Sequence, residues 1–125
     1  MKLTAWVTIA SLLMYIWVFA RAGKARSEHG VKAPSMDGPL AFQSALRVQT
    51  NTVEQLVIFL PLLWLSASYM GDMTAAILGA IWVVGRIIYA LGYYQAPDKR
   101  SLGFGISSVA AIGLLIAAIA GLVMH

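Results

Sequence analysis

The chain has 125 residues, of which 60% are hydrophobic and 11% charged. This composition is typical of a membrane protein and the length is that of one domain, so we expect a single domain over residues 1–125. The absence of cysteine excludes disulfides, thiolate metal sites and a cysteine nucleophile.

Four mostly apolar stretches are long enough to cross a bilayer as helices, which takes roughly 20 residues each. They lie at about residues 3–20, 42–69, 73–94 and 102–124. The chain is therefore predicted to be an all-α integral membrane four-helix bundle with up-down topology, in contact with membrane lipids.

The first stretch has a second interpretation, because Ala20-Arg21-Ala22 resembles the cleavage site of a signal peptide. Its apolar core, however, is longer than the roughly 7 to 15 residues typical of such peptides. Lys24 and Arg26 also follow Arg21, as in a stop-transfer cluster. We therefore favour a membrane span.

Basic residues are concentrated in two of the three connections between these spans. The first connection, at about residues 21–41, is the most basic, the third contains Lys99 and Arg100, and the second has only Asp72. The positive-inside rule places the first and third connections in the cytoplasm. Topology thus accounts for the net charge of +4, and we expect no nucleic-acid partner.

Turn residues and small residues indicate how the spans pack. Gly71-Asp72 predicts a tight turn, so the second and third spans form an antiparallel hairpin. In the last span, Ala117 and Gly121 would permit close helix contact. Such residues are also frequent in membrane helices without marking a particular interface.

Ionisable side chains occur in the interior of only the second and third spans, where a charge costs about 2.5 to 3.5 kcal/mol. In the second span, Arg47, Asn51 and Glu54 follow the i, i+4, i+7 spacing of one helix face, and Gln49 adds polarity nearby. A polar stripe therefore enters the bilayer on this span.

The third span carries a matching stripe, because Arg86, Tyr89 and Tyr93 follow i, i+3, i+7 and Arg100 lies just beyond the helix end. An antiparallel hairpin brings both stripes to the same membrane face, the predicted cytoplasmic one. At about 1.5 Å per residue, Glu54 and Arg86 lie roughly 10 to 20 Å inward, at similar depth. The combined surface matches a small zwitterionic or anionic solute.

A structural alternative is an ion pair between Glu54 and Arg86 that locks the hairpin without any ligand. A single ion pair does not require the further polar positions on the same surface, so the whole set favours a ligand site. His29 and His125 lack a partner pattern that would suggest metal, and we expect no metal site.

The second span contains the string Arg47-Val-Gln-Thr-Asn51-Thr-Val-Glu54-Gln-Leu, with Pro61-Leu-Leu-Trp64 after it. In these two strings it strongly resembles the second span of the MAPEG family. The members of this family are membrane-associated proteins of eicosanoid and glutathione metabolism. The third span resembles the third-helix motif of that family, in the string Gly85-Arg86-Ile-Ile-Tyr89-Ala-Leu-Gly92-Tyr93 followed by Arg100. The Asn-Thr-x-Glu-Gln form is common in prokaryotic members, which implies a bacterial inner membrane.

The resemblance implies a homotrimer that binds glutathione as a co-substrate between adjacent subunits near the cytoplasmic face. It implies a transferase that conjugates glutathione to lipophilic electrophiles, or a peroxidase that reduces lipid hydroperoxides. Arg100 matches the catalytic arginine that activates the thiol. The residues that match glutathione contacts are Arg26, Arg47, Gln49, Asn51, Glu54, Arg86, Tyr89 and Tyr93.

Two departures from the family pattern leave other functions open. Gln55 stands where cysteinyl-leukotriene synthase and related transferases have tyrosine, and Ser27 stands where the synthase has a second arginine, so we do not expect leukotriene synthesis. One alternative is a non-catalytic lipid-binding or scaffold trimer of the same fold. Another is a small transporter with Glu54 as a proton-coupled carboxylate, which the neighbouring arginines make less attractive.

Overall fold

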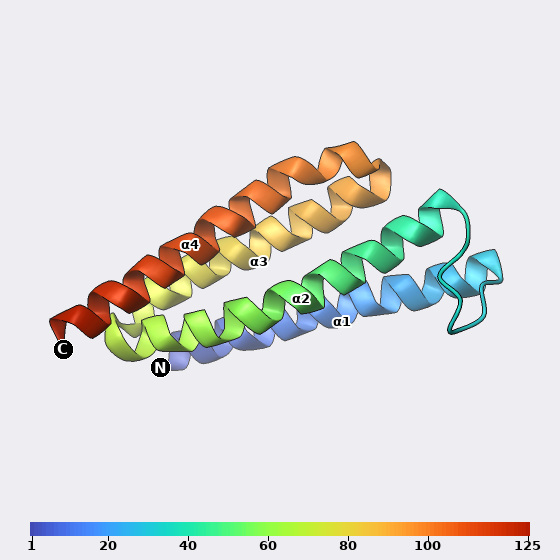
Figure 1. Cartoon of the computed structure of the whole chain (residues 1–125). Coiled ribbons are helices and arrows are strands. Elements are labelled where there is room, and N and C mark those ends of the chain that lie inside the picture. The colour runs from blue at the N-terminus through green and yellow to red at the C-terminus, as the bar shows by residue number, and fades with distance from the viewer.

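The computed structural model describes residues 1–125 as an antiparallel bundle of helices without strands. The elements are α1 (Lys2–His29), α2 (Leu40–Tyr69), α3 (Asp72–Gln95), the short 3₁₀ helix η1 (Pro97–Arg100) and α4 (Ser101–Met124). Both termini lie at one end, whereas residues 30–39 and η1 lie at the other (Figure 1). All four long helices are long and apolar enough to cross a membrane, so the predicted all-α four-helix bundle is confirmed.

The first helix is longer than the predicted span, because it continues to His29. Ala22 and Ala25 are buried against the bundle in this extension, and Lys24 lies 3.7 Å from Glu28 one turn later. The helix ends where Gly30 adopts the left-handed conformation, with φ 64°, and donates its N–H to the Arg26 carbonyl. The expected first connection is therefore shortened to residues 30–39, and its first basic residues belong to a helix.

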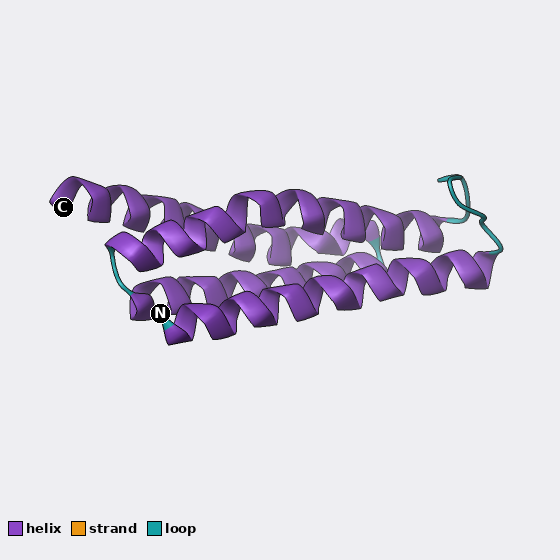
Figure 2. Ribbon diagram, turned by 90° about the horizontal axis from the view of Figure 1, so that it is seen from below, coloured by secondary structure: helices purple, strands orange, loops and turns teal.

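The extension of α1 has a matching partner in α2, and both helices are longer than a hydrocarbon core requires. With 28 and 30 residues, they span about 42 and 45 Å, against a core of roughly 30 Å. Figure 2 shows the two helices side by side up to the loop that joins them. The bundle thus projects from the bilayer at this end.

Asp72 ties the opposite end of the bundle together. Its carboxylate accepts hydrogen bonds from the N–H groups of Leu3 at 3.0 Å and Thr4 at 2.8 Å, and from the Thr4 hydroxyl at 2.6 Å. The residue before α1, Met1, makes no side-chain cap. A carboxylate from the α2–α3 turn therefore satisfies N–H groups at the start of another helix.

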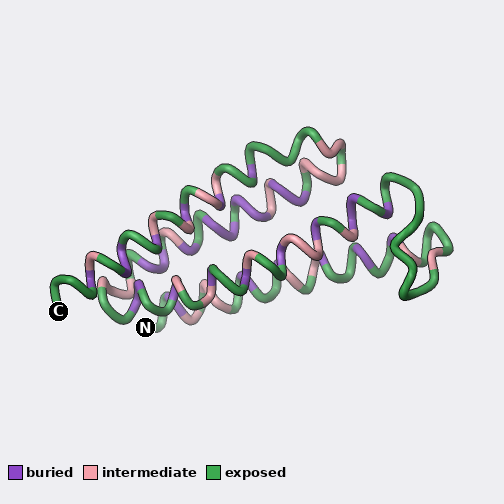
Figure 3. The backbone as a smooth tube through the Cα atoms, viewed as in Figure 1, coloured by how far each residue is buried: buried purple, intermediate pink, exposed green.

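Apolar side chains fill the bundle and also cover its outside. Inside, Phe59 of α2 stacks on Trp82 of α3 with ring centroids 3.8 Å apart, and Val18 and Leu114 are fully buried. Figure 3 shows buried positions along the facing sides of the helices and exposed positions on their outer sides. Many of those outer positions are large hydrophobic residues, as in a protein solvated by lipid.

Glycines bring α3 and α4 into close contact near η1. A Cβ atom placed on Gly103 would collide with the backbone of Tyr89, and one on Gly85 would lie 2.7 Å from the backbone nitrogen of Ser107. The close approach expected at Gly121 also occurs, since a Cβ there would lie 2.6 Å from the Tyr69 carbonyl. Small residues therefore set the spacing of α3 and α4 near η1, and of α4 against the end of α2 at the other end of the bundle.

Candidate functional site

A polar cavity of about 550 Å³ lies between α2, α3, η1 and the start of α4. It brings together two residues from each of the predicted polar stripes. The residues that line it are Arg47, Asn51, Tyr89, Tyr93, Arg100, Ser101, Phe104 and Gly105. Five of these were predicted from the sequence, and they come from three separate elements.

Helical spacing explains how the predicted residues reach the cavity. Arg47 and Asn51 lie one turn apart on α2, and Tyr89 and Tyr93 lie one turn apart on α3. The two tyrosine rings meet edge to face, with centroids 5.7 Å apart. The backbone contact with Gly103 places Tyr89 against the first turns of α4.

Arg100 reaches the cavity from the last position of η1. Its Nη1 donates to the Pro97 carbonyl at 2.6 Å, and its guanidinium carbon lies 5.7 Å from the centre of the Tyr93 ring. The Pro97 bond uses only part of the donor capacity of a guanidinium, which carries five N–H groups. Arg100 can therefore also donate to a ligand.

Arg86 is buried directly behind this cavity, with 1% of its surface exposed. Its Nη2 donates to Asn51 Oδ1 at 2.7 Å and to Thr52 Oγ1 at 2.9 Å, and its guanidinium carbon lies 4.1 Å from the centre of the Tyr89 ring. Nε and Nη1 have no hydrogen-bond partner. Arg86 thus contacts two residues of the cavity wall, and its remaining donors are unsatisfied.

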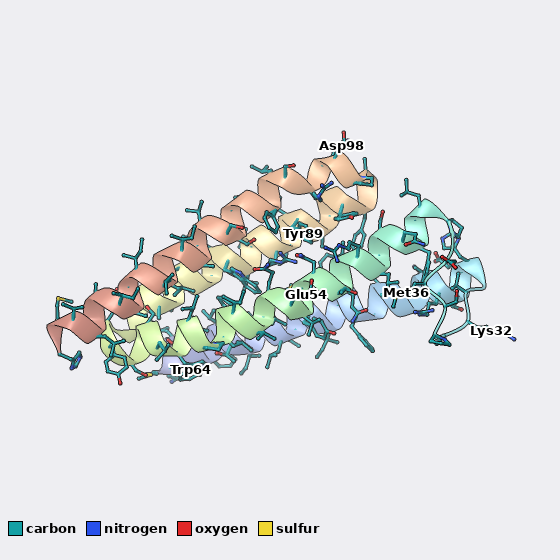
Figure 4. The ribbon with its side chains drawn as sticks, in the orientation of Figure 1. Lys32, Met36, Glu54, Trp64, Tyr89 and Asp98 are labelled. Carbon is teal, nitrogen blue, oxygen red and sulfur yellow. The ribbon has the colours of Figure 1, made fainter.

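The alternative ion pair between Glu54 and Arg86 does not form within the chain. The single ion pair in the structure joins Lys24 to Glu28. Arg86 donates to Asn51 and Thr52 instead. At about 100° per residue, Glu54 lies roughly 60° around α2 from Asn51 and roughly 160° from Thr52. Glu54 is exposed on α2, at a level along the bundle similar to that of Tyr89 on α3 (Figure 4).

Four predicted contacts do not line the cavity: Arg86 lies behind its wall, and three others lie farther away. Glu54 is one of them, and Gln49 instead donates to the Tyr15 hydroxyl of α1 at 3.1 Å. Arg26 donates to the Ser35 carbonyl at 2.7 Å, which ties α1 to the loop at residues 30–39. Within one chain, these three residues are separate from the site.

Sequence analysis missed the contribution of α4 and of one hydroxyl. Ser101, Phe104 and Gly105 follow i, i+3, i+4, so their shared helix face was visible, but none is ionisable. Thr52 lies inside the recognised motif, where its hydroxyl also donates to the Val48 carbonyl at 2.7 Å. That bond is the usual role of a threonine within a helix and gives no sign of a second partner.

The cavity offers the chemistry of an anion site. Arg47 and Arg100 supply guanidinium groups, Asn51 an amide, and the tyrosines two phenols, while no carboxylate lines it. A guanidinium binds carboxylates through paired, charge-assisted hydrogen bonds and stabilises a thiolate. Nowhere in the chain do three His, Cys, Asp or Glu side chains gather as metal ligands.

Comparisons with known proteins cover most of the chain. The sequence model of the MAPEG family matches residues 4–120. An uncharacterized protein of Synechocystis sp. is 45% identical over 115 residues, which cover 92% of this chain and 84% of the relative. Human microsomal glutathione S-transferase 2 is 35% identical over 105 residues, or 84% of this chain and 71% of the relative. Leukotriene C4 synthase of Cavia porcellus is 31% identical over 123 residues, or 98% and 82%.

Proposed function

Because this chain belongs to the MAPEG family, we propose that it is a membrane-bound glutathione transferase or glutathione-dependent peroxidase. The cavity between α2, α3, η1 and α4 carries this proposal, because Arg47 and Arg100 converge there with Asn51 and two tyrosines. Glutathione is the co-substrate, and the second substrate is a hydrophobic electrophile or a lipid hydroperoxide.

The functional groups of glutathione match those of the proposed contacts. Glutathione has two carboxylates, one ammonium group and one thiol. Arg47 and Arg26 are the carboxylate partners, and Glu54 accepts hydrogen bonds from the ammonium group. Asn51 and the tyrosines add neutral donors, while Arg86 holds Asn51 in place.

Arg100 activates the thiol in this proposal. A free thiol has a pKa of about 8.5 and is mostly protonated at neutral pH, whereas a nearby guanidinium stabilises the thiolate. In conjugation, the thiolate sulfur attacks an electrophilic carbon, a C–S bond forms, and the leaving group departs with its electron pair. In peroxide reduction, the thiolate attacks the terminal oxygen of the hydroperoxide and the O–O bond breaks. The alkoxide takes up the proton that the thiol released and leaves as an alcohol, and a second glutathione converts the sulfenic acid to the disulfide and water.

Access for a lipophilic substrate is supported by an apolar groove beside the polar cavity. This groove has a volume of about 490 Å³ and shares Ser101 and Gly105 with the cavity. Ile81, Leu102, Ile106 and Val109 line the rest of it. A hydrophobic molecule in the bilayer can therefore lie with its reactive end close to the thiolate.

We place the complete site between adjacent subunits of a homotrimer, with the first and third connections in the cytoplasm of a bacterial inner membrane. Glu54 supports the shared site, because an exposed carboxylate inside a span is costly when it faces lipid and becomes useful when it faces a neighbouring subunit. Arg26 and Gln49, which lie apart from the cavity of their own chain, would join the cavity of that neighbour.

A second candidate function is a non-catalytic trimer that binds lipid. Gln55 favours it, because this half-buried amide stands where the transferase branch described above has tyrosine. The two functions differ in whether glutathione is consumed.

Conjugation of glutathione to a chromogenic aryl halide by the purified protein tests the proposal. S-methylglutathione is the matched control, because it keeps both carboxylates and the ammonium group but has no thiol. We expect turnover with glutathione, and inhibition by the methylated analogue without turnover. If glutathione neither reacts nor raises the melting temperature, while lipid does raise it, the lipid-binding function is correct instead.

A further inference from the structure

A second polar cavity, of about 210 Å³, lies at the same end of the bundle and shares no residue with the first. Its walls come from the last turns of α1, the first turns of α2 and the end of α3. Arg21, Lys24 and His29 line it, together with the hydroxyl-bearing Tyr94. Nothing in the proposed glutathione chemistry uses this basic cavity.

The positive charge of this cavity is only partly neutralised. Its single carboxylate, Glu28, lies 3.7 Å from Lys24, with side chains 56% and 71% exposed, so their pairing is weak. Arg21 has no carboxylate partner, and its guanidinium carbon lies 4.1 Å from the centre of the Tyr94 ring. The cavity therefore favours an anion beside Arg21.

Tyr94 adds an unused hydrogen-bonding group. Its hydroxyl is buried and has no hydrogen-bond partner, and its ring lies under the Arg21 guanidinium at the cavity wall. The small side chains of Ala25, Ala41 and Ala45 leave the space between α1 and α2 open. A ligand with several acceptor oxygens fits the charge and the open space beside Arg21.

The depth of the cavity indicates where such a ligand comes from. At about 1.5 Å per residue, Arg21 lies roughly 28 Å along α1 from Lys2, close to the hydrocarbon thickness of about 30 Å. The α1 side chains before it include the exposed Leu13, Ile16 and Phe19. The cavity therefore opens at the level of lipid headgroups, where phosphate is the abundant anion.

An apolar groove continues from this cavity towards the bilayer centre. It has a volume of about 450 Å³, and Leu13, Trp17, Val83 and Leu91 are among the apolar residues that line it on α1 and α3. Trp17 also packs edge to face on Tyr94 of the basic cavity, with ring centroids 6.1 Å apart. The basic cavity and the apolar groove therefore adjoin, as the headgroup and the acyl chain of a phospholipid do.

We propose that this chain has a specific site for an anionic phospholipid. Arg21 and Lys24 bind the phosphate, the Tyr94 ring holds the Arg21 guanidinium beside it, and an acyl chain lies in the groove between α1 and α3. The site is independent of glutathione turnover, because none of its residues lines the first cavity.

Native mass spectrometry of the purified full chain in detergent, with phosphatidylglycerol or phosphatidylcholine added, tests the site. We expect wild type to bind phosphatidylglycerol about tenfold or more tightly than phosphatidylcholine. The double variant Arg21→Gln, Lys24→Gln should lose that preference. Ala41→Leu should lower phosphatidylglycerol binding without any change of charge, because leucine fills the cavity.

The double variant Lys32→Gln, Lys99→Gln is the matched control, since it also removes two positive charges from this end of the bundle but none from the cavity. Equal binding of the two lipids by wild type, or an equal loss in the two double variants, would overturn the proposal. Displacement of phosphatidylglycerol by an equal concentration of glycerol phosphate would also overturn it, because the site would then recognise a soluble anion. Size-exclusion elution identical to wild type shows that a variant is folded.

Discussion

The buried Arg86 of α3 donates a hydrogen bond from Nη2 to Asn51 Oδ1 of α2 at 2.7 Å. This bond joins a charge with almost no exposed surface to an amide in the wall of the polar cavity. Two further nitrogen atoms of the same guanidinium have no partner. We therefore propose that Arg86 positions Asn51 for the ligand, at the cost of burying a charge whose other nitrogens are unsatisfied.

Replacement of Arg86 by methionine should separate these two roles. An apolar side chain of similar length removes the buried charge, so we expect a melting temperature equal to or above that of wild type. The KM for glutathione should rise about tenfold, because Asn51 loses the bond that orients it. Arg86→Lys keeps the charge without the planar fork, and wild-type KM in both variants would rule out a positioning role.

Gly103→Ala should destabilise the bundle, because the added methyl group collides with the backbone of Tyr89. We expect a loss of about 1 to 3 kcal/mol, the usual range for overpacking, in thermal unfolding measured in detergent. Gly105→Ala is a matched control on the same helix, since a Cβ there meets no atom within 4 Å. Equal melting temperatures for the two variants would show that α3 and α4 are not in close contact at Gly103.

Asp72→Ala should lower stability by about 1 to 2 kcal/mol without affecting the site. The substitution removes the acceptor for the N–H groups of Leu3 and Thr4 at the start of α1. Asp37→Ala removes the same charge from an exposed loop position and should leave the melting temperature unchanged. A loss as large in Asp37→Ala would mean that net charge, and not the cap, is responsible.

Glu54→Gln should weaken glutathione binding in the assembled protein, by about tenfold in KM, because the ammonium group loses a charged acceptor. Stability should change little, since Glu54 has no partner within its own chain. Asp37→Asn, which also removes one negative charge but at an exposed loop position, controls for the change of net charge. An unchanged KM in Glu54→Gln would exclude this carboxylate from the site.

Periodicity predicted which residues share a helix face, but not which partners they choose. The spacing of Arg47 with Asn51, and of Tyr89 with Tyr93, was sufficient to place all four at one cavity. It was not sufficient for Arg86, because depth alone made Glu54 as suitable a partner as Thr52. Which of the two side chains faces Arg86 depends on how α2 is rotated about its own axis, and hydropathy does not predict that rotation.

Hydropathy located the first apolar stretch but not the end of the helix that contains it. The residues from Arg21 onward are polar, so they do not prolong an apolar stretch, yet Ala22 and Ala25 continue the buried face of the helix. The helix ends only where Gly30 adopts the left-handed conformation. The α4 side of the cavity was missed for a related reason, since Ser101, Phe104 and Gly105 carry no charge that would mark them.

The most direct test of the proposed function is the rate of glutathione conjugation by Arg100→Ala compared with wild type. Removal of a group that stabilises charge on the reacting atom should lower kcat about 100-fold or more, with a much smaller change in KM for glutathione. Lys99→Ala is the control, since it removes the adjacent positive charge outside the cavity and should retain wild-type turnover. Normal turnover by Arg100→Ala would contradict the assignment of thiol activation to Arg100.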